Sequence, residues 1–175
     1  LCSKSGMSIR FAEEDVRTMG RTAAGVRGMD IEDGDEVVGM SIIDKSQKID
    51  LLTVASSGYG KRTHESEYRV QSRGGKGIIT MKTTEKNGEV ISVRSVSDAD
   101  DLMLITDKGQ VVRIRIKEIS TMGRNTQGVR LIRLKEGEKV VACQSLAESV
   151  SEEGQTPQNN GVASAGDTGS EPNQT

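Results

Sequence analysis

The sequence has no tryptophan, two prolines, two cysteines and one histidine among its 175 residues. Cys2 and Cys143 are too few and too far apart in the sequence for a disulfide framework or a zinc site. The single histidine, His64, excludes a His-rich metal site. No apolar run approaches the roughly 18 residues of a membrane-spanning helix, and the first residues lack the basic and apolar parts of a signal peptide. These absences favour a soluble, non-exported protein without a metal site.

Charge is divided unevenly along the chain, although the formal net charge is only -2. No lysine or arginine follows Lys139, whereas five of the 26 acidic residues do. Residues 1–139 therefore carry all 24 basic residues against 21 acidic ones, a net charge of +3, and residues 140–175 carry a net charge of -5. The sequence thus predicts a mildly basic body followed by an acidic segment.

The end of the chain has the composition of a disordered segment. Both prolines, Pro157 and Pro172, lie there, and Gly, Ser, Asn, Gln and Thr fill most of residues 151–175. So few apolar side chains cannot bury enough surface to offset the entropy that is lost on ordering. We therefore expect a disordered acidic tail over residues 148–175.

The body of the chain repeats in units of about 51 residues. Four glycines recur after 103 residues, and two of them also recur after 52. The glycines of the successive copies are Gly6, Gly20, Gly25 and Gly34, then Gly58 and Gly77, then Gly109, Gly123, Gly128 and Gly137. The copies span Gly6–Met40, Gly58–Val93 and Gly109–Cys143. A repeat of this period predicts a solenoid, a propeller or an array.

Local patterns within each copy predict short β-strands. Residues 101–106 form a short apolar run, and residues 112–117 alternate between apolar and basic side chains, as in a half-buried strand. No segment sustains an amphipathic helix. Several short strands per repeat, separated by glycines, predict an all-β, propeller-like array. The absence of tryptophan and of a repeated Gly-His disfavours the WD40 and kelch types.

This interpretation divides the chain into a partial blade at residues 1–46, a second blade at residues 47–98 and a last blade at residues 99–147. The segment Leu1-Cys2-Ser3 aligns with Thr53-Val54-Ala55, so the first blade begins in the middle of a strand. We therefore expect the chain to be part of a longer protein.

Arginines recur at equivalent positions of the copies. One column consists of Arg10, Arg62 and Arg113, and a second of Arg21, Arg73 and Arg124. Two partial columns contain Arg27 and Arg130, and Arg17 and Arg69. If blades surround an axis, equivalent positions fall on one rim, where arginines form a curved track suited to a phosphate backbone.

Two further features bear on this track. With only three aromatic residues, Phe11, Tyr59 and Tyr68, base stacking contributes little, which favours duplex DNA over single strands. The alternative is that the arginines are solvated and pair with nearby acids such as Glu13, Glu65 and Glu118.

The middle copy contains the sequence Gln71-Ser72-Arg73-Gly74-Gly75-Lys76-Gly77, here called the box-like loop. A P-loop is excluded, because Gly77 rather than Ser or Thr follows Lys76. The loop resembles the glycine-rich QRRGGKG box of the gyrase A C-terminal domain family, with Ser72 as the one departure. Residues 58–63 and 123–129 resemble further segments of that family, and the likeness extends over residues 1 to about 147.

The resemblance implies a β-pinwheel, a propeller-like disc of four-stranded blades whose basic rim bends and wraps duplex DNA without sequence specificity. It implies the last three blades and the tail of this domain, within a bacterial, ATP-dependent type II topoisomerase that introduces negative supercoils in the cytoplasm and is associated with the nucleoid. The catalytic tyrosine, the sites for ATP and Mg²⁺ and the contacts with gyrase B in an A2B2 heterotetramer would lie in parts outside this segment. The segment itself is expected to contain no catalytic residue and no cofactor.

One departure concerns position, because the family's principal box lies in its first blade and this loop lies in the next-to-last one. Arg73 and Lys76 are therefore expected to be rim contacts. The candidate DNA-binding residues are Arg10, Arg21, Arg27, Lys61, Arg62, Arg69, Arg73, Lys76, Arg113, Arg115, Arg124 and Arg130. Two alternatives are the related C-terminal domain of topoisomerase IV, which usually lacks a recognisable box, and a protein-interaction propeller with no role in nucleic-acid binding.

Overall fold

The computed structural model describes residues 1–44 and 46–146, and the expected acidic tail lies outside the described residues. Its strands are β1 (Cys2–Ser3), β2 (Met7–Ser8), β3 (Val37–Gly39), β4 (Asp50–Ala55), β5 (Tyr59–His64), β6 (Ile78–Ile79), β7 (Val90–Val96), β8 (Asp101–Thr106), β9 (Val111–Arg115), β10 (Val129–Arg130) and β11 (Val140–Leu146). A single 3₁₀ turn follows the second strand of each copy: η1 (Glu13–Asp15), η2 (Glu65–Glu67) and η3 (Ile116–Glu118).

This described part contains no α-helix, so the all-β prediction is confirmed. The expected alternation near residue 112 is also present, since β9 exposes Arg113 and Arg115 and partly buries Val112 and Ile114. No helix in the described chain is long and apolar enough to cross a membrane.

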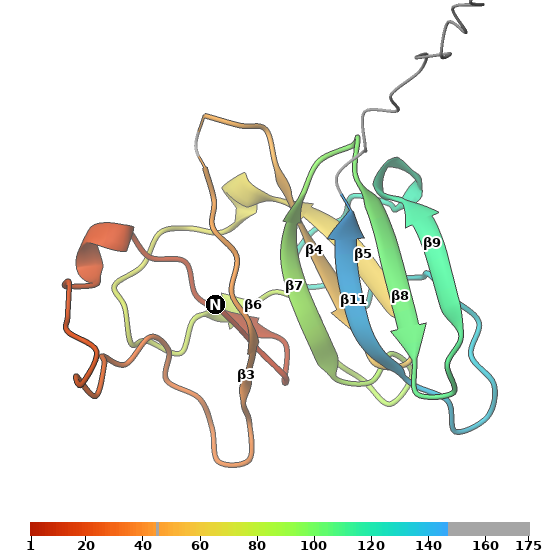
Figure 1. The fold of residues 1–175 in the computed structure, drawn as a ribbon, viewed down its shortest axis with the longest axis horizontal. Coiled ribbons are helices and arrows are strands. Elements are labelled where there is room, and N and C mark those ends of the chain that lie inside the picture. Colours follow the sequence, from red (N-terminus) through yellow and green to blue (C-terminus); the bar gives the residue numbers. More distant parts are fainter. Residues whose placement is uncertain (45, 147–175) are drawn as a thin grey trace, which may run out of the picture.

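The strands form three antiparallel sheets (Figure 1), and each of the first two sheets accepts one strand from the copy that follows it. The sheet orders are β3-β1-β2-β6, β10-β5-β4-β7 and β11-β8-β9. The second copy supplies β6 to the first sheet, and the third copy supplies β10 to the second sheet. The strand β9, which corresponds to β2 and β5, has no outer neighbour among the described residues. Each pair of successive copies is therefore joined by backbone hydrogen bonds.

Two glycines permit this exchange. Gly77 precedes β6 and Gly128 precedes β10, and both have a positive φ, 83° and 78°, respectively. A Cβ at Gly77 would overlap the carbonyl oxygen of Ser8, and one at Gly128 would overlap that of Gly60. The two glycines thus allow the backbone of one copy to reach the strand of the previous sheet in a conformation that other residues rarely adopt.

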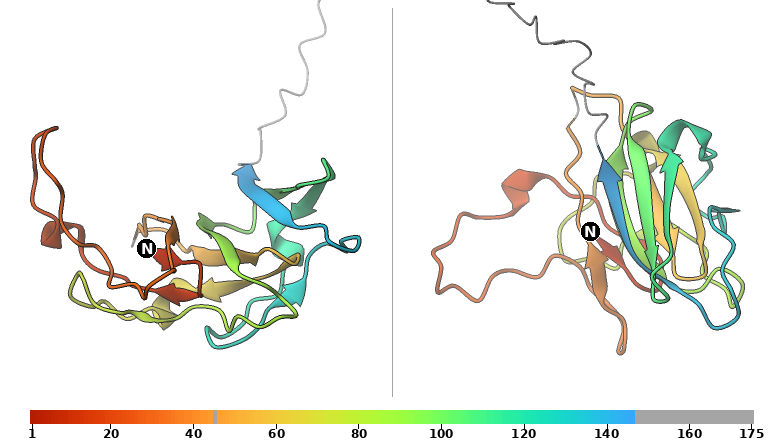
Figure 2. Two further views of the ribbon diagram at one scale, coloured as in Figure 1. Left: turned by 90° about the horizontal axis from the view of Figure 1, so that it is seen from below. Right: turned by 45° about the vertical axis from the view of Figure 1, so that its right-hand side comes forward.

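The sheets lie side by side along an arc (Figure 2, left). β7 contacts both β3 and β11, so these three edge strands gather on one side of the array. The opposite side, formed by β6, β10 and β9, is here called the outer edge. The loops that precede β6 and β10, including the box-like loop, lead directly onto this outer edge.

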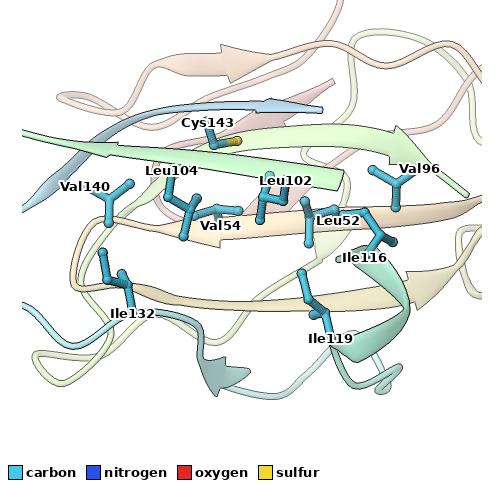
Figure 3. Packing of buried hydrophobic residues seen from close by; sticks show 10 residues of the cluster. All are labelled: Leu52, Val54, Val96, Leu102, Leu104, Ile116, Ile119, Ile132, Val140 and Cys143. Atoms are coloured by element: carbon cyan, nitrogen blue, oxygen red, sulfur yellow. The ribbon is translucent and has the colours of Figure 1, made fainter. Parts of the chain in front are cut away.

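Two apolar clusters fill the spaces between neighbouring sheets, here called the first and second junctions. Every residue of β4 is buried, because its alternate side chains enter different clusters. Leu51 and Ala55 lie in the first junction, whereas Leu52 and Val54 lie in the second. Figure 3 shows the second cluster, in which Leu102 and Leu104 of β8 face β4. The third sheet has a neighbour on one face, and its strand β8 accordingly alternates between buried and partly exposed residues.

Candidate nucleic-acid interface

The first arginine column holds successive copies together. The side chain of Arg10 is only 16% exposed and lies in the first junction. Its Nη1 donates to a carboxylate oxygen of Glu65 at 2.6 Å and to the carbonyl oxygens of Glu65 and Tyr68 at 2.9 and 3.0 Å. The alternative of pairing with a nearby acid therefore holds for Arg10. Arg113 ends this column, pairs with Asp101 of its own sheet and is 66% exposed.

Arg62 makes the corresponding contact at the second junction, where its side chain is 11% exposed. Its Nε lies 3.4 Å from a carboxylate oxygen of Asp50, and its guanidinium also pairs with Asp98. Nη2 donates to the hydroxyl of Thr121 in the next copy at 3.0 Å. The hydrogen bond from Arg62 lowers the pKa of the Asp98 carboxyl. His64 completes this cluster with its Nδ1 at 2.7 Å from Asp50.

The second arginine column reaches in the opposite direction, from one copy back to the previous one. Arg73 donates to the carbonyl oxygen of Arg27, and Arg124 donates to the carbonyl oxygen of Ile79 at 2.9 Å. Arg27 and Ile79 occupy equivalent positions in the first and second copies. The remaining member of the column, Arg21, is exposed. Both complete columns therefore contribute to the junctions wherever a neighbouring copy is described.

Lys61 is fully buried in the second junction. Its ammonium donates to the carbonyl oxygens of Gly123 and Arg124 and, at 3.0 Å, to the hydroxyl of Thr126. Burial lowers its pKa to about 8, so the ammonium stays mostly charged at neutral pH. The equivalent residue at the first junction is the buried Ile9. The Lys61 side chain fixes the loop of the next copy and has no exposed surface for a ligand.

The box-like loop is fastened to the first copy by its backbone. The N–H of Gly74 donates to the carbonyl oxygen of Gly28 at 2.9 Å, and the N–H of Asp30 donates to that of Gly75 at 3.0 Å. Lys76 is exposed on the same loop. The loop therefore presents an exposed cation, Lys76, from a fixed backbone, while Arg73 is directed to the carbonyl oxygens of Asp15 and Arg27 in the first copy.

The predicted site residues thus fall into two groups. Arg10, Lys61, Arg62, Arg73 and Arg124 are buried or partly buried and make contacts between copies. Seven others are exposed: Arg21, Arg27, Arg69, Lys76, Arg113, Arg115 and Arg130. Among the described residues, Arg27 pairs with Asp30 at 3.4 Å and Arg113 with Asp101, whereas the other five have no ion pair.

A further basic cluster surrounds Tyr59 and was not predicted. Lys86 and Arg133 belong to it together with Arg130, and neither was among the predicted site residues. They were missed because the comparison of copies selected recurring arginines, whereas the residues equivalent to Arg133 are Asp30 and Lys82. The short spacing of Arg130 and Arg133 beside a strand was the available signal.

No set of three or more His, Cys, Asp or Glu side chains within residues 1–44 and 46–146 is arranged to hold a metal ion. The described residues therefore provide no fit for the Mg²⁺ that the resemblance implies for the holoenzyme. We derive no step through that ion or through ATP.

The fold and these contacts define a class of protein: an array of strand-exchanging antiparallel sheets with arginine-linked junctions and exposed cations near its outer edge. The family described as the DNA gyrase C-terminal domain, beta-propeller, matches residues 1–44, 50–97 and 100–147. The chain belongs to this family, which confirms the resemblance and the propeller-like fold predicted from the sequence.

Individual relatives agree with this assignment. The A subunit of DNA gyrase from Salmonella typhimurium strain LT2 is 50% identical over 153 residues, which are 87% of this chain and 17% of the relative. A solved DNA gyrase A C-terminal domain is 28% identical with a TM-score of 0.71, over 82% of this chain and 48% of that one. The C-terminal domain of a DNA topoisomerase IV is 22% identical with a TM-score of 0.78, over 83% and 45% of the two chains, and shows the fold alone. The chain spans about one sixth of the length of the curated relatives it matches.

Proposed function

We propose that this chain binds and bends duplex DNA without sequence specificity, as part of the A subunit of a DNA gyrase. The observation that carries the proposal is the row of exposed cations on or near the outer edge. Arg115 and Arg130 lie in the outer edge strands β9 and β10, Lys76 lies on the loop that leads onto β6, and Arg21 and Arg69 are exposed on other loops. None of these five forms an ion pair with a described residue. Unpaired guanidinium and ammonium groups distributed over several copies suit an extended anion such as a duplex better than a compact ligand.

The type of contact follows from the fold. The described chain has no α-helix that would enter a major groove and read base edges. Contacts to phosphates fix a protein on DNA without sequence information. Bending a site of about 20–30 base pairs costs on the order of 1–6 kcal/mol, which several phosphate contacts spread along the bend would offset. Arg10, Lys61 and Arg62 are left out of the proposed DNA contacts because they are enclosed in the junctions.

The wider role is proposed from the relatives, whose names identify them as A subunits of DNA gyrase. The complete protein would introduce negative supercoils with ATP as a type II topoisomerase, together with gyrase B in an A2B2 heterotetramer, in the bacterial cytoplasm and at the nucleoid. DNA cleavage, ATP hydrolysis and the contacts with gyrase B would belong to parts outside this segment. The segment would contribute the bend that directs a DNA duplex towards those parts.

Two alternative functions are compatible with the fold. A C-terminal domain of topoisomerase IV would share the fold, and the box-like loop favours gyrase over it. A protein-interaction propeller would use the same sheets without binding DNA. The response of binding to salt separates this last function from the proposed one.

The test measures binding of the 175-residue chain to a fluorescent duplex by anisotropy between about 50 and 200 mM salt. We expect affinity to fall steeply, with a log–log slope of about -0.9 for each phosphate contacted. Replacing Arg21, Arg69, Lys76 and Arg130 by Gln should make the salt dependence weaker. If each of the four contacts one phosphate, the magnitude of the log–log slope decreases by about four. The control replaces Lys108, Lys117, Lys135 and Lys139, four exposed lysines, by Gln and removes the same charge.

Ligation of a nicked circle in the presence of the chain then measures bending, since a wrapped duplex changes the linking number of the product. Absence of duplex binding at low salt, or an affinity that is insensitive to salt, would contradict the proposed function.

A further inference from the structure

Two cavities lie at equivalent places of the first and second sheets and share equivalent lining positions. The first cavity, of about 330 Å³, is lined by Met7, Ile79 and Lys82 among others. The second, of about 440 Å³, is lined at the corresponding positions by Tyr59, Arg130 and Arg133. The second is here called the Tyr59 pocket. The same place in the repeat therefore holds different chemistry at the two junctions.

Cations converge on the Tyr59 ring. The ammonium of Lys86 lies 5.6 Å from the ring centroid, and the guanidinium carbon of Arg130 lies 5.7 Å from it. Arg133 lines the same pocket on the chain segment that follows β10. Three positive side chains from two different copies are thus gathered around one aromatic residue. Arg130 and Arg133 line the pocket itself, and Lys86 lies at the Tyr59 ring without lining the pocket.

Acids do not neutralise this group. Lys86, Arg130 and Arg133 form no ion pair with any described residue. The first cavity, in contrast, is lined by Asp30, Glu32 and Asp35 as well as by lysines. The charge of the Tyr59 pocket is therefore positive, and that of its counterpart is mixed.

The pocket also provides oriented hydrogen-bond donors. Nη2 of Arg130 donates to the hydroxyl oxygen of Tyr59 at 3.1 Å, which leaves the hydroxyl hydrogen of Tyr59 able to donate to a ligand. The hydrogen bond from Arg130 lowers the pKa of the Tyr59 phenol. The guanidinium has further N–H groups beyond the one used here, and a fork of such donors suits the oxygens of a phosphate.

We infer that the Tyr59 pocket is a phosphate-binding site that takes one backbone phosphate of duplex DNA. The guanidinium groups of Arg130 and Arg133 and the Tyr59 hydroxyl supply the donors, and the ammonium of Lys86 at the Tyr59 ring adds positive charge beside the pocket. The pocket includes β10, a strand of the outer edge, so a duplex that follows this edge would pass it. This inference rests on the proposed function and adds to it Tyr59, Lys86 and Arg133 as contact residues.

The first experiment compares duplex binding of the chain with that of the double variant Lys86→Gln and Arg133→Gln. We expect affinity at low salt to fall on the order of tenfold and the magnitude of the log–log salt slope to decrease by about one to two. The control is Lys82→Gln, which removes a positive charge at the position equivalent to Arg133 but from the mixed cavity. We expect Lys82→Gln to change affinity by less than about twofold.

The second experiment places the ligand in the pocket. The sequence has two tyrosines and no tryptophan, so Tyr68→Phe leaves Tyr59 as the only strong fluorophore. Its fluorescence is followed while the chain is titrated with a short duplex and, separately, with inorganic phosphate. We expect the duplex to change the Tyr59 signal in step with binding, inorganic phosphate to do so only at much higher concentration, and the double variant to abolish the change.

The outcomes are distinct. Unchanged affinity and slope in the double variant, with normal binding by the unmodified chain, overturn the pocket and leave the proposed function standing. A Tyr59 response to inorganic phosphate with none to the duplex overturns DNA as the source of the phosphate. No duplex binding by the unmodified chain overturns the pocket and the proposed function together.

Discussion

The first and second junctions have the same topology, and arginines at equivalent positions cross them in the same directions. In each, an arginine of the earlier copy reaches forward, Arg10 or Arg62, and an arginine of the later copy reaches back, Arg73 or Arg124. A parallel bridge also joins each forward arginine to the next copy. The backbone exchange of β6 and β10 completes the shared plan.

The side chains behind this plan differ in kind. Ile9 is an apolar residue at the first junction, whereas the equivalent Lys61 is a buried ammonium with three oxygen partners. Arg10 pairs with one acid, Glu65, and Arg62 lies within a larger cluster of charged groups. The backbone contacts therefore recur at both junctions. The side chains that stabilise this geometry are apolar at one junction and ionic at the other.

The most direct test of this difference between the junctions gives the second junction an apolar side chain at position 61. Lys61→Met keeps most of the length of the side chain but removes the donor from two carbonyl groups and a hydroxyl. A polar group that loses its hydrogen-bond partner costs about 1–3 kcal/mol, and here water and the Thr126 hydroxyl, which also donates to the carbonyl oxygen of Gly123, replace part of the lost contacts. We therefore expect a loss of about 2–4 kcal/mol in the free energy of unfolding. Chemical denaturation followed by circular dichroism measures it.

The matched control is Ile9→Met at the first junction, an apolar exchange of similar volume at the equivalent position. We expect it to cost less than about 1.5 kcal/mol. Equal losses for the two variants would show that Lys61 acts only by filling space, and the distinction between the junctions would fail.

The pH dependence of stability sharpens the same comparison. Burial lowers the pKa of Lys61 from 10.5 to about 8, so between these values the unfolded chain holds a proton that the folded chain has released. The free energy of unfolding therefore rises with pH in this window, and below the window Lys61 adds no pH dependence. We expect the unmodified chain to gain about 2 kcal/mol relative to Lys61→Met between about pH 8 and pH 10.

The measurement is a pair of denaturation series at several pH values. Burial raises the pKa of the Cys2 thiol to about 12, which opposes stability above about pH 9, but both chains share this group and the difference cancels it. A difference that stays constant with pH would mean that the folded pKa of Lys61 is close to that of a free lysine.

The repeat, the strands and the family were predictable from the sequence, because glycine spacing and alternation of apolar residues are local signals. The strand exchange was not predictable. A glycine such as Gly77 indicates that the backbone needs conformational freedom, but nothing near it in the sequence reveals that Ser8 of the previous copy lies against it. That information resides in contacts between residues about 70 positions apart.

The candidate site was predictable only as a set of positions. Aligning the copies found the arginine columns, and equivalent residues do occupy equivalent places. An equivalent place, however, is either an exposed rim or a junction: Arg62 and Arg113 belong to the same column, yet their side chains are 11% and 66% exposed. Burial by the neighbouring copy decides between the two, and it depends on the stacking of the sheets rather than on any one repeat.

The first arginine column offers the finest test of the comparison, because its three members differ only in what surrounds them. Arg62→Gln leaves the carboxylate of Asp50, which is mostly buried, without its cation, and we expect a loss of about 1–2 kcal/mol in the free energy of unfolding. Arg10→Gln leaves the more exposed Glu65 and should cost about 1 kcal/mol. Arg113→Gln removes an exposed pair and should cost less than about 0.5 kcal/mol.

Denaturation of the three variants under one set of conditions tests this order of stability losses. Duplex anisotropy on the same samples measures the losses of DNA affinity, which should be largest for Arg113→Gln. Arg113 is exposed on the outer edge strand β9, so its loss should weaken DNA binding more than the loss of Arg10 or Arg62 does. Equal destabilisation by all three variants would contradict a junction role for the column. If Arg62→Gln weakened DNA binding most and left the free energy of unfolding unchanged, Arg62 would be a DNA contact rather than a junction residue.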